Sequence, residues 1–261
     1  RSLPRRRSSS RASVESDFGG GIDTRIRIES GQTRGQVKIS WHEQECSQPS
    51  PGEPDEKKLE EYLARPLEEL ELAALMMDGL EVAGQTVVVI LGITIDGRKV
   101  PLGIWLGSTE NSTVCTALLQ NLLERGLRID ESILCVIDGG KGIRKALIDV
   151  FGDLAVIQRC QVHKLRNLRS YLPKSRHAYV LQTMKQAYKS KSAKKARKRL
   201  QALVSWLERN GYDEVAGSLS EGMEETLTVL KLALPELLRK SLATTNSIEN
   251  LNGTIRRVSR N

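Results

Sequence analysis

The chain has 261 residues and a formal net charge of +8 at neutral pH, from 40 Lys or Arg and 32 Asp or Glu. Its hydrophobic fraction of 39% supports a packed core but is low for a chain that is folded throughout. It contains no run of about 18 apolar residues, which excludes a membrane-spanning helix. Its four cysteines lack the spacing of a disulfide framework, which predicts reduced thiols in a cytosolic protein.

The N-terminal segment, residues 1–58, is rich in Arg, Ser, Gly and Pro and shows little hydrophobic periodicity. This composition predicts a disordered or poorly ordered leader. A short helix is expected around residues 55–64. Because the chain begins without Met and ends at Asn261 inside a predicted helix, we interpret it as a fragment, and a truncated copy is one expectation.

Strand and helix patterns alternate over residues 59–159, which predicts an α/β domain with a mixed sheet and flanking helices. Asp96-Gly97 is a two-residue hairpin signal between the second and third strands. Helices are predicted for residues 111–125 and 142–151. Strands are predicted for residues 72–82, 86–95, 99–106, 132–137 and 154–159.

Residues 160–245 show helical periodicity, and a last helix is expected to start at Asn246. Residues 154–207 contain fourteen Lys or Arg and no acidic residue. One interpretation is a solvated helix face, but without acidic partners the run favours contact with a polyanion, and we expect nucleic acid. The helices are predicted for residues 161–172, 176–190, 192–209, 213–220 and 224–240. The basic candidates are Lys189, Lys191, Lys194, Lys195, Arg197, Lys198 and Arg199.

Three acidic residues lie where a metal site can form. Asp78 follows the apolar run 72–77, and Asp138 ends the apolar run 133–137 before a glycine pair. Glu249 lies near the start of the last predicted helix. Carboxylates at strand ends and on a neighbouring helix can hold two Mg²⁺ ions about 4 Å apart, the arrangement that clamps both oxygens of a phosphodiester displacement.

Each of these residues also has a structural interpretation. Asp78-Gly79 can form a turn, and Asp138 can cap the helix that follows it or join a phosphate loop, although the G-x-x-x-x-G-K-[ST] pattern is absent. Glu249 stands three residues after Asn246, which is the spacing of a capping box. Cys160 and His163 share one helical face if the helix has begun, and such a pair more often serves packing than chemistry.

Together these features resemble the Mutator-type family of DDE transposases, whose bacterial branch comprises insertion-sequence transposases. The resemblance covers residues 59–261. Asp-Gly alone is a weak signal, whereas the ordered set with a helical block before the glutamate is specific. The matching motifs are Asp78-Gly79, Val136-Ile137-Asp138-Gly139, Cys160-x-x-His163 and Thr245-Asn246-x-Ile248-Glu249-x-Leu251-Asn252.

The resemblance implies a ribonuclease H-like catalytic fold whose sheet is interrupted, before the last helix, by an all-helical insertion. Residues 160–245 would form this basic insertion, and residues 246–261 would begin the last catalytic-domain helix. Asp78, Asp138 and Glu249 would be the catalytic residues and ligands of two Mg²⁺ ions, for which Mn²⁺ can substitute. Cys160 and His163 match a C-x-x-H motif whose role stays unassigned.

The implied activity is Mg²⁺-dependent DNA cleavage and strand transfer at the ends of an insertion element. Implied partners are element ends and target DNA, which the basic residues above would contact together with Arg256 and Arg257. A homo-oligomer on DNA, at the bacterial nucleoid and without a membrane, is expected. Two alternatives stay open: a ribonuclease H-like nuclease or resolvase without strand transfer, and a catalytically dead DNA-binding remnant. Family members usually carry a folded helical DNA-binding region before the catalytic domain, and residues 1–58 do not resemble one.

Overall fold

A five-stranded mixed sheet forms the centre of the computed structural model, which describes residues 15–17, 23–30, 37–44, 61–82, 85–107 and 112–259. The strand order is β6-β5-β4-β7-β8: the first three strands are antiparallel, and β4, β7 and β8 are parallel to one another. Each strand lies within one residue of its predicted bounds. The strands are β4 (Leu72–Val82), β5 (Gln85–Thr94), β6 (Lys99–Gly107), β7 (Ile133–Ile137) and β8 (Ala155–Arg159).

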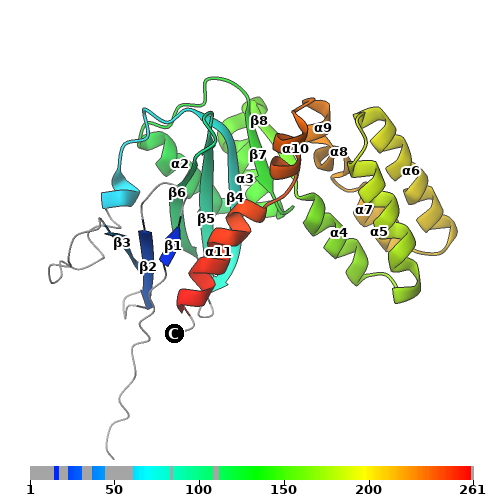
Figure 1. Cartoon of the computed structure of the whole chain (residues 1–261), viewed down its shortest axis with the longest axis horizontal. Helices are drawn as coiled ribbons and strands as arrows, with labels where there is room; N and C mark the ends of the chain where they lie inside the picture. Colours follow the sequence, from blue (N-terminus) through cyan, green and yellow to red (C-terminus); the bar gives the residue numbers. More distant parts are fainter. Residues whose placement is uncertain are drawn as a thin grey trace, which may run out of the picture.

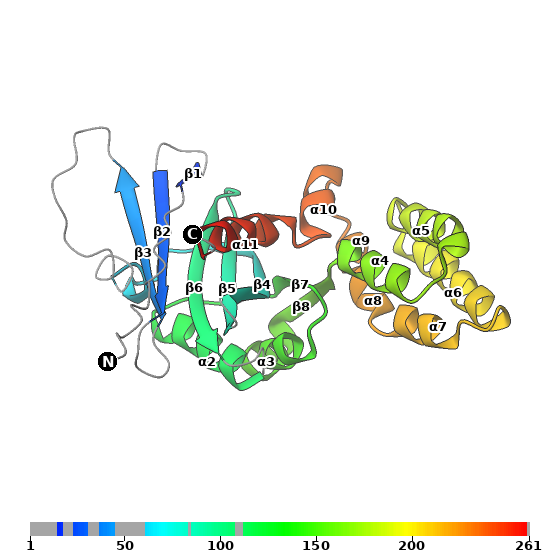
Figure 2. The same cartoon turned by 90° about the horizontal axis from the view of Figure 1, so that it is seen from below.

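Helices cover both faces of this sheet (Figure 2). Side chains alternate along a strand, so Leu75 and Met77 of β4 pack toward α2 and α3, whereas Ala74 and Met76 pack toward α11. Burial on both faces explains the nearly continuous apolar sequence of the central strands. The covering helices are α2 (Ser112–Glu124), α3 (Lys141–Phe151) and α11 (Asn246–Ser259).

A helical arm extends from the end of the sheet and has a hydrophobic core of its own (Figure 1). Leu200, Leu203 and Leu207 lie on one face of α6, at helical spacing, and are buried in this core. Pro173 precedes the first residue of α5, where a missing N–H costs nothing. The arm comprises α4 (Gln161–Ser170), α5 (Lys174–Tyr188), α6 (Ala193–Arg209) and α7 (Asp213–Ser220).

The helix expected over residues 224–240 is wrong as one continuous element. Pro235 cannot donate a backbone hydrogen bond, and Ala233 adopts a left-handed φ of 51°, so the chain breaks between α9 and α10. A further break at Leu227 makes three short helices in all. These short helices also contact the sheet, since the Thr228 hydroxyl donates to Ile157 O at 2.6 Å. The short helices are α8 (Met223–Thr226), α9 (Thr228–Lys231) and α10 (Glu236–Leu242).

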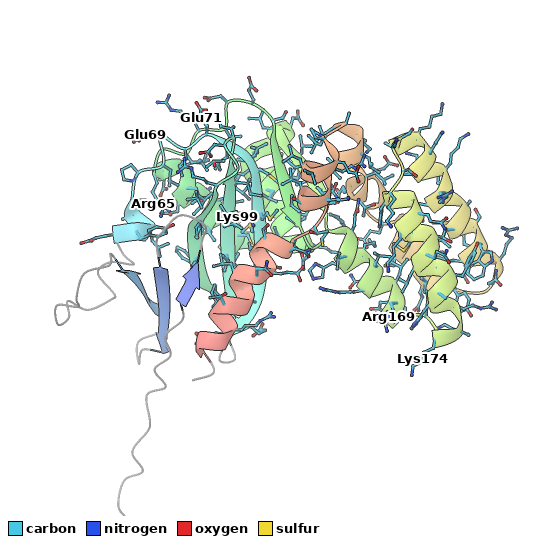
Figure 3. The ribbon with its side chains drawn as sticks, in the orientation of Figure 1. Arg65, Glu69, Glu71, Lys99, Arg169 and Lys174 are labelled. Atoms are coloured by element: carbon cyan, nitrogen blue, oxygen red, sulfur yellow. The ribbon has the colours of Figure 1, made fainter. Side chains whose placement is uncertain are left out.

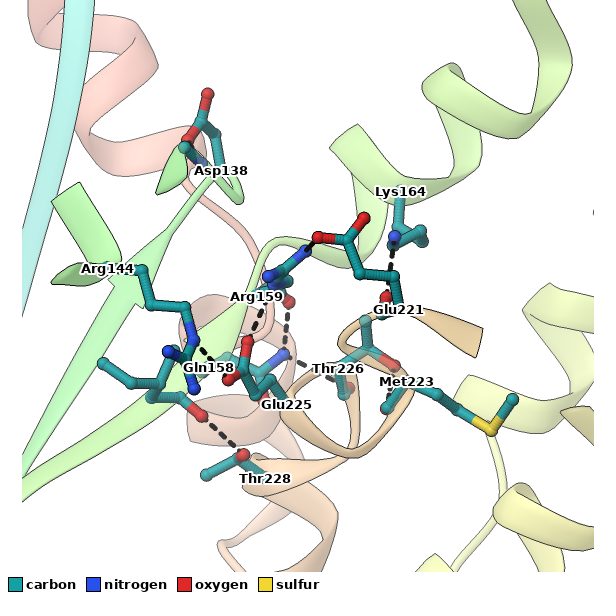
Figure 4. A network of polar contacts seen from close by, with 12 residues as sticks. Asp138, Arg144, Gln158, Arg159, Lys164, Glu221, Met223, Glu225, Thr226 and Thr228 are labelled. Atoms are coloured by element: carbon teal, nitrogen blue, oxygen red, sulfur yellow. Dashed lines mark hydrogen bonds and ion pairs between the residues drawn. The ribbon is translucent and has the colours of Figure 1, made fainter. Parts of the chain in front are cut away.

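An ion-pair network holds the base of the arm against the sheet (Figure 4). The buried Arg159 guanidinium at the end of β8 donates to Glu225 at 2.7 Å, and Arg144 of α3 donates to the other oxygen of the same carboxylate at 2.7 Å. Glu221 lies 3.7 Å from Arg159. Gly222 has φ +65°, and a Cβ there would come within 2.6 Å of the Arg159 guanidinium. Both the backbone and the neighbouring side chain therefore favour glycine at this position.

A second, three-stranded antiparallel sheet lies within residues 15–44, where we expected only a poorly ordered leader. The alternation in Thr24-Arg25-Ile26-Arg27-Ile28-Glu29 is a strand pattern that the overall composition of the segment obscures. This sheet lies beside α11. The rest of residues 1–58 is outside the described part, as are residues 55–60 of the short predicted helix; residues 61–64 are helical. The strands are β1 (Glu15–Asp17), β2 (Asp23–Ser30) and β3 (Val37–Gln44).

Candidate active site

The fold brings Asp78 and Asp138 to neighbouring positions. β4 and β7 run parallel, with Met77 opposite Ile137, so the next residue of each chain segment is one of the two aspartates. Asp78 shares the strand face of Met76, which packs toward α11. Burial raises the pKa of the Asp78 carboxyl, and the negative charge of nearby Asp138 raises it further. Two residues separated by sixty positions thus form one acidic site.

Asp78 is an integral part of strand β4. It pairs with Val89 of β5, so the interpretation of Asp78-Gly79 as a turn is wrong. Burial, helped by the charges of Asp138 and Glu249, raises the pKa of Asp78 to about 6, although His163 and Asn252 act in the opposite direction. A carboxylate in this setting is unfavourable unless a cation or a proton neutralises it.

Asn252 of α11 holds the Asp78 carboxylate in place. Its Nδ2 donates to Asp78 Oδ2 at 2.7 Å, and both side chains are buried. Its Oδ1 is buried without a hydrogen-bond partner among the described residues. Asn252 lies three residues after Glu249 and hence on the same side of α11. The sequence shows this spacing, but it does not show that Asn252 binds Asp78.

Asp138 occupies the turn between β7 and α3. Gly140 N–H donates to its Oδ1 at 2.8 Å, and Gly139 between them has φ +116°, which side-chain-bearing residues rarely adopt. Asp138 therefore shapes the turn ahead of α3, but it does not cap the helix as that interpretation expected, because the N-cap residue is Gly140 and no side chain caps the helix. Among the described residues its Oδ2 accepts no hydrogen bond, so the half-buried carboxylate keeps one oxygen for a ligand.

Glu249 lies in the first turn of α11 but does not form the expected capping box with Asn246. Within the described residues its Oε1 accepts from the Thr245 hydroxyl at 2.8 Å, and its Oε2 accepts from Arg166 at 3.4 Å. Burial acts to raise the pKa of Glu249, but the Thr245 hydrogen bond and the charges of His163 and Arg166 outweigh it, so the pKa is lowered. The carboxylate is held ionised and oriented.

Cys160 and His163 lie directly against Glu249. Cys160 is the N-cap residue of α4, and its buried Sγ accepts from His163 N–H at 3.5 Å and from Thr245 N–H at 3.4 Å. The Thr245 hydroxyl lies 3.3 Å from Cys160 Sγ and 3.3 Å from His163 Nδ1. His163 Nδ1 is 3.8 Å from Glu249 Oε1. The C-x-x-H motif therefore joins the starts of α4 and α11 around the glutamate.

The Cys160 thiol and the His163 imidazole also shift each other's pKa. Burial acts to raise the pKa of Cys160, but hydrogen bonds from His163 and Thr245 outweigh it and lower the pKa. The hydrogen bond to Cys160 raises the pKa of His163 in turn. The opposite directions of the two pKa shifts reflect the direct hydrogen bonding between the two residues, and perturbed pKa values of this kind often occur at functional sites.

The predicted basic residues lie mostly in solvent on the helical arm, where Figure 3 also shows Arg169 and Lys174 at one edge. Arg197 is the exception, because it is half-buried and pairs with Glu224, which also binds Lys231 at 2.8 Å. Arg256 is exposed on α11; the side chain of Arg257 is outside the described part. The exposed arm residues are Lys189, Lys191, Lys194, Lys195, Lys198 and Arg199.

Comparison with known proteins assigns the sequence of this chain to a family. The profile described as "Transposase, Mutator family" matches residues 52–261. The chain belongs to the Mutator family of transposases. No helix among the described residues of this Mutator-family chain is long and apolar enough to cross a membrane.

Curated relatives of this Mutator-family chain are named as transposases of insertion sequences. The transposase for ISRM5 of Rhizobium meliloti is 34% identical over 67% of this chain and 43% of its own length. The ISRM3 transposase of the same organism is 29% identical over 69% of this chain and 44% of the relative. The transposase for IS256 in transposon Tn4001 of Staphylococcus aureus is 30% identical over 64% of this chain and 42% of the relative. The chain thus spans less than half of each of these relatives.

Proposed function

We propose that this chain carries the catalytic core of a DDE-type DNA transposase with a ribonuclease H-like fold. It would cleave phosphodiester bonds at the ends of an insertion element and join the freed 3′ ends to target DNA. The observation that carries the proposal is the convergence of Asp78 on β4 and Asp138, directly after the adjacent parallel strand β7, with Glu249 on the helix that covers them. Three antiparallel strands followed by two parallel ones, flanked by helices, support the fold assignment.

The residues present fit Mg²⁺. The three candidate ligands are carboxylates, which hard divalent cations prefer. The raised pKa of Asp78 reflects burial and negative charge that no cation of the chain fully offsets, and the buried Asn252 Oδ1 is a further oxygen without a partner among the described residues. Asp78, Asp138 and Glu249 would hold two Mg²⁺ ions, or Mn²⁺ in their place. Bound ions of this kind polarise phosphoryl oxygens and lower the pKa of coordinated water.

The protein's own contribution is to position these carboxylates before DNA arrives. Asn252 fixes Asp78, the backbone turn at Gly140 fixes Asp138, and the hydroxyl of Thr245 fixes Glu249. Cleavage and joining are both in-line phosphoryl displacements, so one such site serves both steps. Charged groups that are already in position when the substrate binds usually supply most of the rate enhancement in such reactions.

The helical arm would hold the DNA backbone. Its exposed Lys and Arg side chains give affinity and orientation without reading base sequence. Binding through phosphates releases counterions and is therefore strongly salt-dependent. A homo-oligomer assembled on element ends, at the bacterial nucleoid, completes the proposal.

The test is a cleavage and joining assay with the chain itself. The substrate is a labelled duplex that contains the terminal sequence of the insertion element flanked by donor DNA, with a plasmid as target and Mg²⁺ or Mn²⁺ present. We expect nicking at the element boundary and covalent transfer of the labelled 3′ end to the plasmid. Cleavage without transfer would identify a nuclease instead, and DNA binding without any cleavage in either metal would reject catalysis by this chain.

A further inference from the structure

The C-x-x-H motif has donors that the proposed Mg²⁺ chemistry does not use. Cys160, His163 and Glu249 each offer one ligand atom, and these atoms all lie within 4.8 Å of one another. Sulfur and imidazole are poor ligands for Mg²⁺ and good ligands for borderline thiophilic ions. The cluster therefore differs in kind from the carboxylates of Asp78 and Asp138.

We propose that Cys160, His163 and Glu249 form a second cation site, for a thiophilic divalent ion such as Zn²⁺. Through its use of Glu249 this site would compete with the Mg²⁺ site. The competition rests on the proposed function; the binding itself does not. Binding would release the Cys160 thiol proton to solvent, as metal binding by cysteine does.

Distances in the cluster approach those of a tetrahedral zinc site. Zn–S bonds of about 2.3 Å and Zn–N or Zn–O bonds of about 2.0–2.1 Å place the corners of such a site about 3.3–3.6 Å apart. The Thr245 hydroxyl lies 3.3 Å from Cys160 Sγ and from His163 Nδ1, and His163 Nδ1 lies 3.8 Å from Glu249 Oε1. The three protein ligand atoms lie within 4.8 Å of one another, wider than the corners of such a site, so a bound ion would draw them together, with the Thr245 hydroxyl or water at the fourth corner.

The cluster combines buried residues with partly exposed ones. Cys160 and Thr245 are fully buried, while the side chains of His163 and Glu249 are 25% and 27% exposed. The partial exposure of His163 and Glu249 leaves the cluster accessible to a cation, while two backbone N–H groups donate to the buried thiol. Occupancy would draw Glu249 Oε1 toward the thiol and away from Asp78.

The binding test uses the purified chain without DNA, with Co²⁺ as the spectroscopic probe and Zn²⁺ as competitor. We expect a thiolate-to-Co²⁺ charge-transfer band that Zn²⁺ abolishes. Loss of a supporting partner alone lowers metal affinity roughly 10- to 100-fold, so Cys160→Ser should lose the band and at least about 100-fold in Zn²⁺ affinity. His163→Gln, a change at a more exposed side chain, should lose a similar factor. Cys135→Ala, which removes a buried thiol of β7, should retain the parental band and affinity.

Parental Zn²⁺ affinity in both Cys160→Ser and His163→Gln, or a parental protein without the charge-transfer band, would overturn the site. The competition is measured separately, as Mg²⁺-dependent cleavage during Zn²⁺ titration. We expect Zn²⁺ to stop cleavage by the parental protein, and cleavage to resume when a zinc-selective chelator removes Zn²⁺ and leaves Mg²⁺ in place. Cleavage by Cys160→Ser should resist Zn²⁺ when compared with that variant's own rate without zinc. Metal binding in a chain that never cleaves DNA would contradict the proposed function and leave the cation site standing. Equal zinc sensitivity of both proteins would overturn the competition.

Discussion

The two faces of the central sheet are built from the same strands and differ in what they enclose. The face toward α2 and α3 is largely apolar, with residues such as Leu75, Met77 and Ile137 fully buried, and its buried charge, Arg159, lies at the end of β8. The face toward α11 begins in the same way, but Asp78 and its partner Asn252 interrupt its packing. Two adjacent residues of β4 thus differ in role: Met77 packs in the hydrophobic core, and Asp78 places a carboxylate on the opposite face.

This difference shows where the fold gives up stability. An apolar side chain at position 78 would extend the hydrophobic contacts of α11, whereas the carboxylate there has a pKa raised to about 6 by burial and by its acidic neighbours. A group held ionised against such a shift opposes folding at neutral pH. The cost is understandable if a cation occupies the α11 face during function.

The largest expected effect comes from removing one charge of the α11 face. Asp138→Asn keeps the side-chain oxygen that accepts from Gly140 and removes the negative charge. Cleavage of an element-end duplex in Mg²⁺ should fall by at least about 1,000-fold, because a metal-site charge acts directly on the transition state. DNA affinity, measured by fluorescence anisotropy, should stay near the parental value. Parental cleavage would place Asp138 outside the active site.

Substitutions at two adjacent positions of β4 should change stability in opposite directions. Met77→Ala opens a cavity in the apolar face and should lower the free energy of unfolding by about 2–5 kcal/mol. Asp78→Asn should raise it by roughly 1–3 kcal/mol at pH 8 without divalent metal. Urea unfolding in EDTA measures both. A loss of stability in both variants would show that the α11 face carries no electrostatic strain.

The same stability gain should depend on pH in a defined direction. The pKa of Asp78 is about 6 in the folded protein against an ordinary value of 3.8, so the ionised carboxyl opposes folding. The gain from Asp78→Asn should be full above about pH 6 and vanish below about pH 4. Mg²⁺ affinity of the parental protein, measured by calorimetry, should fall as the pH drops below about 6, because protons compete for the carboxylate. A Mg²⁺ affinity that stays constant from about pH 5 to about pH 8 would contradict the raised pKa of Asp78.

The smallest expected effect is on the salt dependence of DNA binding, and it comes from the helical arm, which covers neither face of the central sheet. Neutralising the exposed Lys194, Lys195 and Lys198 should reduce the slope of log affinity against log salt by up to about 0.9 for each lost phosphate contact. Lys145→Gln on α3, which pairs with Asp149, should leave the slope unchanged. An unchanged slope in the arm variant would exclude this surface as the DNA contact.

Much of the sheet was predictable because its signals are local. The apolar runs that end at Asp78 and Asp138 mark two strands, and Asp96-Gly97 marks the hairpin. The broken helix over residues 224–240 was missed because its leucines keep helical spacing across Pro235. The strands of residues 15–44 were missed because the surrounding Arg, Ser and Gly obscure a short alternating pattern.

The candidate site could be predicted only in part. Motif order predicted Asp78, Asp138 and Glu249 as site residues, and the register of β4 and β7 places the two aspartates at neighbouring positions. The cluster around Glu249 depends on contact between the starts of α4 and α11, and the Thr245–Cys160 bonds span 85 residues of sequence. Periodicity carries no information on such a contact, so Thr245 and Arg166 had no assigned partner before the structure.

Cleavage by Glu249→Gln tests the central claim most directly, with Glu236→Gln as a matched control, because both glutamates lie in the first turn of a helix. The substitution keeps the size of the side chain and should cost no more than about 1 kcal/mol of stability. If Glu249 completes the metal site, Mg²⁺-dependent cleavage should fall by at least about 1,000-fold while Glu236→Gln cleaves normally. Cleavage by Glu249→Gln at the rate of the control would contradict the account.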